Sequence, residues 1–236
     1  MVSTVIKNWD NKNWLSSNNY IKSFNNFLIK NIKLNSNSKI LDIGCGRGKI
    51  LGSLSSKLKL KNKPLGIDVI NHKDKDNRIN FKKIDAKNFF SKNKNQFDLI
   101  LIKQTIHLLD LNTIKKLLFL SKKNLSKNGK IFIFTLDTYQ NELPTFKLMK
   151  TKLEKSLDRD KKILEFISNL YPKRLKKKFI YNVKILKKKY LEMIDKRFIS
   201  ILLSLNNQQI SIGLNEINSK YKKTIRFKDR LTCIVL

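Results

Sequence analysis

The chain has 236 residues, of which 41% are hydrophobic, and this length and composition predict a folded globular protein rather than a disordered chain. It has no run of about 18 apolar residues, no apolar signal-peptide core near Met1 and only two cysteines. These features argue against a membrane-spanning helix, secretion and a disulfide framework. We expect a cytoplasmic protein without a metal site, because no Cys/His cluster has metal-ligand spacing.

Lysine and arginine outnumber aspartate and glutamate by 51 to 18, so the formal net charge is +33. Such a charge attracts nucleic acids and acidic membrane surfaces. The lysines are nevertheless spread from Lys7 to Lys228 among abundant Asn and Ile, a distribution that AT-rich codons produce without selection for binding. A nucleic-acid site concentrates its charge on one face or tract. We therefore expect non-specific binding of polyanions at most, with no specific nucleic acid and no membrane as partner.

The predicted elements begin with an amphipathic helix over residues 15–34, in which apolar side chains recur every three or four positions. Five short apolar runs follow, separated by spacers of helical length, at residues 39–43, 64–68, 79–84, 97–102 and 130–135. Buried strands that alternate with helices predict right-handed βαβ units, and hence a parallel sheet with helices on both faces.

After residue 137 the pattern changes, and helical periodicity appears over residues 148–170, 187–205 and 208–221. A sixth strand is predicted at 179–185 and a seventh at 230–236. We expect one α/β domain over residues 1–236, with a mostly parallel, seven-stranded sheet. Its predicted parts are an N-terminal helical lid (1–37), a core (38–136), a helical cap with one strand inserted after the fifth strand (137–228) and a C-terminal strand (229–236).

The most informative segment is residues 40–50, ILDIGCGRGKI, in which an apolar strand runs into a glycine-rich turn that opens a helix. Without Cβ atoms, Gly44, Gly46 and Gly48 permit positive φ and let a ligand approach the backbone, while free N–H groups at the helix start point toward it. Lys49 stands where the dinucleotide fingerprint G-x-G-x-x-G has its third glycine. The turn therefore favours a ligand other than a dinucleotide.

Two further strand ends carry acidic residues that suit a nucleoside. Asp68 ends the sequence GID twenty residues beyond Gly48, and its carboxylate can accept hydrogen bonds from both hydroxyls of a ribose. Asp85, followed by Ala86 and then by two phenylalanines, can accept from an adenine amino group between apolar walls. Taken alone, each is more often an ordinary strand-end turn. Their order along the chain indicates one site for an adenosyl ligand.

In this order, the DIGCGRG loop, the GID strand end, the DA pair and the FDLIL strand at 97–101 resemble the class I, Rossmann-like S-adenosylmethionine-dependent methyltransferases. The resemblance covers residues 38–136, and it implies a Rossmann-like fold and S-adenosylmethionine as the cofactor. The cofactor-binding residues that it implies are Asp42, Gly44, Cys45, Gly46, Gly48, Asp68, Val69, Asp85, Ala86 and Lys103.

The resemblance also implies a role for several of these residues. The turn over residues 44–48 wraps the methionine part of the cofactor, and Asp42 steadies that turn. Asp68 holds the ribose, and Asp85 with the Ala86 backbone binds the adenine. Cys45 also suits a small apolar filler.

The fourth strand ends in KQTIHLLD (103–110), over the point where such sheets place their reacting atoms. It lacks the Asn/Asp-Pro-Pro-Tyr motif of amino-directed nucleic-acid methyltransferases and the Pro-Cys nucleophile of cytosine-C5 enzymes. It is similar to this segment in small-molecule methyltransferases of the trans-aconitate and juvenile-hormone-acid types. His107 is a candidate general base or a hydrogen-bonding residue of the following helix, and Gln104 a candidate for orienting substrate or cofactor. Lys103 either attracts an anionic substrate or lies on the surface.

Three residues outside the predicted core are candidates for binding the substrate. Trp14 and Tyr20 either line a closed chamber or pack within the protein. Arg197 falls in the apolar stripe of the helix predicted over 187–205, where it must reach water, pair with an internal carboxylate or face the cavity. The last option predicts an anionic small molecule held by the guanidinium.

We therefore expect a methyltransferase that acts on a small metabolite, with an anionic metabolite as the more specific hypothesis. An RNA methyltransferase is an alternative that only the charge favours. A non-catalytic adenosyl-ligand-binding protein of the same fold is a second alternative, and the intact acidic and glycine positions argue against it.

Overall fold

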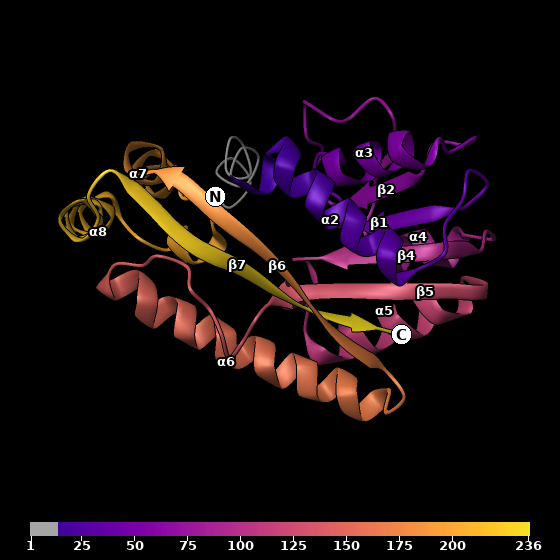
Figure 1. Cartoon of the computed structure of the whole chain (residues 1–236). Helices are drawn as coiled ribbons and strands as arrows, with labels where there is room; N and C mark the ends of the chain where they lie inside the picture. The colour runs from indigo at the N-terminus through magenta and orange to yellow at the C-terminus, as the bar shows by residue number, and fades with distance from the viewer. Residues whose placement is uncertain (1–13) are drawn as a thin grey trace.

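The computed structural model describes residues 14–236, and its centre is a seven-stranded sheet in the order β3-β2-β1-β4-β5-β7-β6 (Figure 1). Strands β1 to β5 run parallel, and β7 lies antiparallel between β5 and β6. This confirms the predicted mostly parallel sheet. The strands are β1 (Ile40–Ile43), β2 (Leu65–Asp68), β3 (Asn80–Lys83), β4 (Phe97–Lys103), β5 (Leu125–Leu136), β6 (Leu175–Leu186) and β7 (Thr224–Val235).

Helices cover both faces of the sheet because the central strands bury side chains on both sides. Along β4, Leu99 and Leu101 belong to one hydrophobic cluster, whereas Ile100 and Ile102 belong to another. The first cluster includes side chains of α2 (Asn18–Asn31) and α3 (Lys49–Leu58), and the second those of α4 (Ala86–Lys92), α5 (Leu111–Lys123) and the C-terminal half of α6 (Lys147–Leu170). Burial on both faces makes these strands continuous apolar runs, which is why their positions could be predicted.

The β6–β7 ribbon is longer than the sequence indicated. Each strand has twelve residues, the two pair along their whole length, and Figure 1 shows them extending past the parallel strands. The predicted cap ended at residue 228 and the C-terminal strand began at 229. The structure corrects this boundary, since β7 begins at Thr224, within the predicted cap. Ile225 and Phe227 alternate there with cationic side chains, the period of a half-buried strand. At the far end of the ribbon lie α7 (Lys187–Asp195), η3 (Ser200–Leu202) and α8 (Asn207–Lys220).

The helix predicted over 187–205 is wrong beyond Asp195, because a Schellman motif ends α7 there. The Phe198 N–H donates to the Met193 carbonyl at 3.0 Å, and the Arg197 N–H donates to the Ile194 carbonyl at 2.9 Å. Arg197 occupies the left-handed position of this motif, with φ of 51°, where glycine is usual. Because no glycine stands there, the sequence carries no stop signal for the helix.

The predicted N-terminal lid is described only from Trp14 onward, and residues 1–13 lie outside the described residues. The short helix η1 (Trp14–Ser16) leads into α2, which begins where the Ser17 hydroxyl accepts from the Tyr20 N–H. Helix α2 packs against α3 and β6 and so covers the sheet. Within the described part of the predicted lid, residues 14–37, η1 alone lines the cavity described below, and α2 packs on the sheet.

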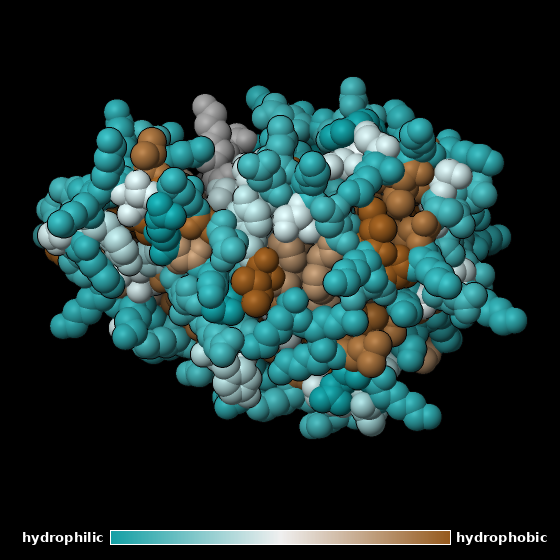
Figure 2. Space-filling model, viewed as in Figure 1, coloured by the Kyte–Doolittle hydropathy of each residue, from teal (hydrophilic) through white to brown (hydrophobic). Residues whose placement is uncertain are grey.

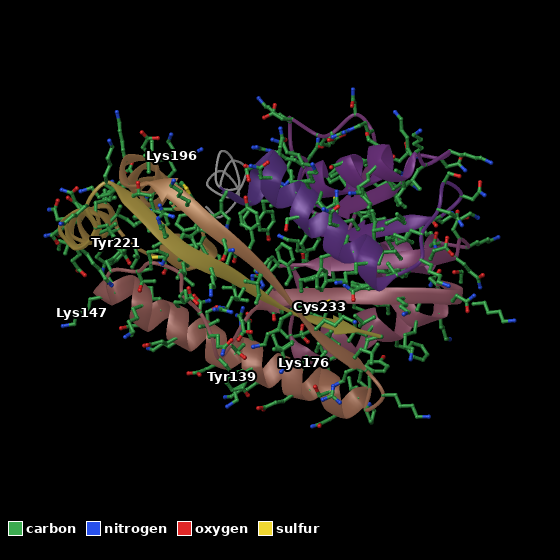
Figure 3. The ribbon with its side chains drawn as sticks, viewed as in Figure 1. Tyr139, Lys147, Lys176, Lys196, Tyr221 and Cys233 are labelled. Atoms are coloured by element: carbon green, nitrogen blue, oxygen red, sulfur yellow. The ribbon has the colours of Figure 1, made fainter. Side chains whose placement is uncertain are left out.

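The surface is hydrophilic over most of the face that Figure 2 shows, with apolar side chains in separate small patches. Three labelled lysines in Figure 3, Lys147, Lys176 and Lys196, lie at well-separated points, at the start of α6, on β6 and after α7.

No helix within residues 14–236 has both the length and the apolarity needed to cross a membrane.

Candidate active site

A cavity of about 570 Å³ opens at the carboxyl ends of β1, β2 and β4. Strand β1 pairs with β2 on one side and β4 on the other, so the cavity lies at the point where the strand order reverses. Ligands of open α/β sheets bind at such points. Further walls come from η1, η2 (Ile106–Leu108), α6, η3 and β7. The cavity therefore joins the parallel sheet to the ribbon and its helices.

The glycine-rich turn forms one wall of this cavity. Gly44, Gly46 and Gly48 have φ angles of 74°, 56° and 71°, a region that disfavours residues with a Cβ. A Cβ on Gly44 would lie 2.2 Å from the Thr105 hydroxyl oxygen, so the turn also packs directly on the end of β4. Helix α3 begins at Lys49, and its first-turn N–H groups lie beside the turn. The positive φ angles predicted for the three glycines are confirmed.

Asp68 holds the turn in place through its carboxylate. One oxygen accepts from the Gly46 N–H and the other from the Ile70 N–H, both at 2.9 Å. A carboxylate has about four acceptor sites, so two stay available to a ligand. Next to it, Val69 leaves 61% of its surface exposed on the cavity wall. Asp85 caps α4 by accepting from the Asn88 N–H at 2.9 Å.

The structure brings all ten predicted cofactor residues to this one cavity. One of them lies on β1, six come from the turn and the residues at the end of β2, and the other three from the start of α4 and the end of β4. The residues are Asp42, Gly44, Cys45, Gly46, Gly48, Asp68, Val69, Asp85, Ala86 and Lys103.

The cavity wall contains three ionisable residues that interact electrostatically, namely the buried Asp42 and Asp229 and the half-buried Lys103. No hydrogen-bond partner for the Asp42 Oδ1 atom occurs within residues 14–236. Burial raises the pKa of Asp42 to about 7; the Lys103 ammonium opposes this, and the Asp68 carboxylate adds to it. Burial lowers the pKa of Lys103, while Asp229 and Asp42 favour its charged form. On the far side, Asp229 accepts from the Trp14 indole N–H at 3.1 Å. Lys103 thus interacts with a carboxyl group of β1 and with the carboxyl group that accepts from Trp14 of η1.

Gln104 and His107 follow β4 and line the cavity. Gln104 has φ of 54° although it is not glycine, and its N–H donates to the Phe134 carbonyl at 2.9 Å. Residues held in this strained region cluster at functional sites. Burial, with the nearby Arg159 charge, lowers the pKa of His107 to about 4. His107 is therefore a neutral imidazole at pH 7, suited to hydrogen bonding and weak as a general base.

The structure separates the three predicted substrate residues. Trp14 lines the cavity, and its ring packs against Phe198 and Phe227 at centroid distances of 5.3 and 5.1 Å. Tyr20 is fully buried in the sheet-face cluster, with its ring 5.6 Å from Phe179, so its assignment to the cavity is wrong.

Arg197 lies outside the cavity lining, so its predicted role in holding an anionic substrate is also wrong. Its guanidinium donates to the Asn207 side-chain oxygen at 2.7 Å and to the Leu205 carbonyl at 3.4 Å. The side chain therefore ties the end of α7 to the start of α8. The physical reason is the early end of α7, which removes Arg197 from the helical stripe on which the prediction depended.

Comparison with known proteins is decisive for the family. The sequence model of the methyltransferase small domain family matches residues 15–162, which is more than half of the chain. The chain belongs to this methyltransferase family. No curated protein sequence matches it significantly.

Solved structures of other methyltransferases share the fold at low sequence identity. The plantazolicin methyltransferase BpumL, in complex with a pentazolic desmethylPZN analogue and SAH, is 20% identical, with a TM-score of 0.54 over 98% of this chain and 88% of that one. A SAM-dependent methyltransferase from Geobacter sulfurreducens, with bound S-adenosyl-L-homocysteine, is 12% identical (TM-score 0.55; 98% and 96% covered). A putative methyltransferase from an antibiotic biosynthesis pathway of Anabaena variabilis is 14% identical (TM-score 0.56; 90% and 96% covered). The predicted Rossmann-like methyltransferase fold is thereby confirmed.

Sequence reasoning missed two buried carboxyl groups in the cavity of this methyltransferase. Asp160 on α6 is 3% exposed, and Asp229 on β7 is 7% exposed. Burial raises the pKa of Asp160 to about 6, against the nearby Arg159 charge. A signal was present in the sequence, because Asp160 falls on the buried stripe of α6 that also contains Leu153, Ile163 and Ile167.

The cavity wall of the methyltransferase has a charge balance unlike that of the whole chain. In the described part of the chain, five aspartates line it, and so do five cationic residues. In the whole sequence, cationic residues outnumber acidic ones by 51 to 18. The excess of positive charge therefore lies away from the cavity. The five aspartates are Asp42, Asp68, Asp85, Asp160 and Asp229, and the five cations are Arg47, Lys49, Lys103, Lys228 and Arg230.

Proposed function

We propose that the protein binds S-adenosylmethionine in this cavity and transfers its methyl group to a small acceptor molecule. The observation that carries the proposal is the convergence of the glycine turn and of the acidic ends of β1 and β2 on one cavity. Its volume of about 570 Å³ falls in the range of roughly 300–1,000 Å³ that is usual for small-molecule sites. The family and the fold of the methyltransferases described above support the same reading.

The residues of the cavity fit this cofactor. The three glycines with positive φ line the cavity, so no side chain of theirs separates a ligand from the backbone of the turn. The Asp42 Oδ1 atom has no hydrogen-bond partner within residues 14–236, and it can accept a hydrogen bond from the ammonium group of the methionine part of the cofactor. The free acceptor sites of Asp68 suit the ribose hydroxyls, and Asp85 with Val69 suits the adenine.

S-adenosylmethionine supplies a methyl group that is already activated by the positive sulfonium. The chain therefore has to position the acceptor and exclude water, and no strong base is required. Apolar side chains of η3, β7 and the loop after β5 enclose the cavity, and they include Leu143, Ile201 and Phe227. Gln104 and His107 add polar groups at the end of β4, where they can orient the acceptor by hydrogen bonds.

The charge of the cavity wall supports a small acceptor rather than RNA. A polyanion site would gather lysines and arginines, but the wall holds as many aspartates as cations among the described residues. Arg230, one of these cations, is already paired with Glu142 at 2.6 Å. The anionic metabolite expected from the sequence loses its main support, because Arg197, the residue assigned to hold it, lies outside the cavity lining and binds Asn207.

Labelled methyl transfer tests the proposal. The full chain is incubated with methyl-labelled S-adenosylmethionine and a small-molecule metabolite extract, in parallel with RNA. We expect label in a small molecule for the wild type and for Asp74→Ala, an exposed control in the loop after β2. Asp68→Ala should transfer little. Label that appears in RNA and in no small molecule would contradict the proposed acceptor class.

A further inference from the structure

Asp160 is a buried carboxyl group on the wall of the cavity. It projects from the middle of α6 into the cavity, is 3% exposed, and its Oδ1 atom has no hydrogen-bond partner among residues 14–236. Its neighbour Arg159 donates instead to the main-chain carbonyl of His107. An unsatisfied buried carboxyl group destabilises a protein, whereas an apolar side chain at this position would continue the stripe of α6. Residues 14–236 therefore supply no donor to this Asp160 oxygen, and its place on the cavity wall lets a bound molecule supply one.

The surroundings of Asp160 indicate what kind of donor fits. Leu153 and Ser156 lie on the same helix and line the same cavity, and His107 on η2 adds an Nδ1 atom that has no partner within the described residues. The α6 and η2 part of the wall thus offers the Asp160 acceptor oxygen beside Leu153, together with a His107 nitrogen that accepts or donates according to its tautomer. The cavity-lining cations belong to other elements, namely the glycine turn, α3, β4 and β7.

We propose that Asp160 binds and orients a hydrogen-bond-donating group of the methyl acceptor, so that the acceptor is an amine, amidine or alcohol on an apolar body and not a carboxylate. This inference rests on the proposed function, because it assumes that the glycine-turn side of the cavity holds the cofactor. A cationic amine gains most, since it neutralises the buried carboxylate as well as donating to it. An anionic acceptor meets repulsion from the same group.

Three matched probes test the inference with the full chain loaded with S-adenosylhomocysteine. Benzylamine, benzyl alcohol and benzoate share one apolar ring and differ in donor capacity and charge. Calorimetry should detect benzylamine binding, weaker binding of benzyl alcohol and none of benzoate. Asp160→Asn should weaken benzylamine binding at least tenfold and leave the S-adenosylhomocysteine affinity unchanged. Asp158→Asn is the control, because it removes the same charge from an exposed position of the same helix.

Melting curves confirm that each variant is folded, and Asp160→Ala serves as a second variant if Asp160→Asn is not. The inference is overturned if benzoate binds as tightly as benzylamine, if no amine binds, or if benzylamine affinity is the same in wild type and folded variant. Failure of the wild type to bind S-adenosylhomocysteine would overturn the proposed function together with the inference. Binding of S-adenosylhomocysteine without amine binding overturns the inference alone.

Discussion

Replacing Asp160 by Asn should make the protein more stable at neutral pH, and the gain should disappear in acid. The pKa of this carboxyl is about 6 in the folded protein, against an ordinary value of 3.8, because burial disfavours the charged form. A pKa that is raised on folding contributes stability below the unfolded value and loses it as the pH rises through the folded value. The difference of about two pH units corresponds to about 3 kcal/mol of unfolding free energy.

Thermal melts of the wild type and Asp160→Asn between pH 4 and pH 7.5 measure this effect. At pH 4 both side chains are neutral, so the melting temperatures should differ least. By pH 7.5 the variant should have gained up to about 3 kcal/mol relative to the wild type, or roughly 6–12 °C for a chain of this size. Asp158→Asn should show no such trend. A difference between wild type and Asp160→Asn that does not change with pH would refute the reasoning.

Three further predictions concern the turn, the cap helices and the surface charge. Gly44→Ala should lower both the melting temperature and the S-adenosylhomocysteine affinity, because the new Cβ would contact Thr105 at 2.2 Å and φ is 74°; an unchanged affinity in calorimetry would contradict this. Arg197→Lys should lower the melting temperature, since Lys cannot reproduce the contacts to Leu205 and Asn207. It should leave ligand affinity unchanged, and a loss of ligand affinity without a loss of stability would show that Arg197 contributes to the binding site. RNA binding in filter assays should be independent of sequence and should fall steeply from low to physiological salt, and tight sequence-dependent binding at high salt would contradict a diffuse charge.

The parts of the fold and site that could be predicted are those encoded in short sequence segments. Strands buried on both faces are continuous apolar runs, and the glycine turn needs its residues at fixed spacing. The ends of consecutive parallel strands meet at one edge of the sheet. The positions of Asp42, Asp68 and Asp85 in one cavity therefore followed from their order along the chain.

The remaining features depend on contacts between distant segments or on exceptions to local rules. Trp14 and Asp229 are 215 positions apart, and nothing near either residue indicates their hydrogen bond. Arg197 occupies the left-handed position after α7, where glycine is usual. The predicted helix therefore extends beyond the real end of α7, and the prediction places Arg197 on the cavity side. The sequence does show Asp160 as a charge within an apolar helical stripe, but it does not show that this stripe borders a cavity.

Calorimetric titration of S-adenosylhomocysteine tests the central claim most directly, because it measures the cofactor site without knowledge of the acceptor. The wild type and Asp74→Ala should bind with equal affinity. Asp68→Ala should bind about 10- to 150-fold more weakly, since it loses carboxylate hydrogen bonds worth about 1.5–3 kcal/mol. Absence of any binding heat from folded wild-type protein, or full affinity in Asp68→Ala, would contradict the assignment of this cavity to the cofactor.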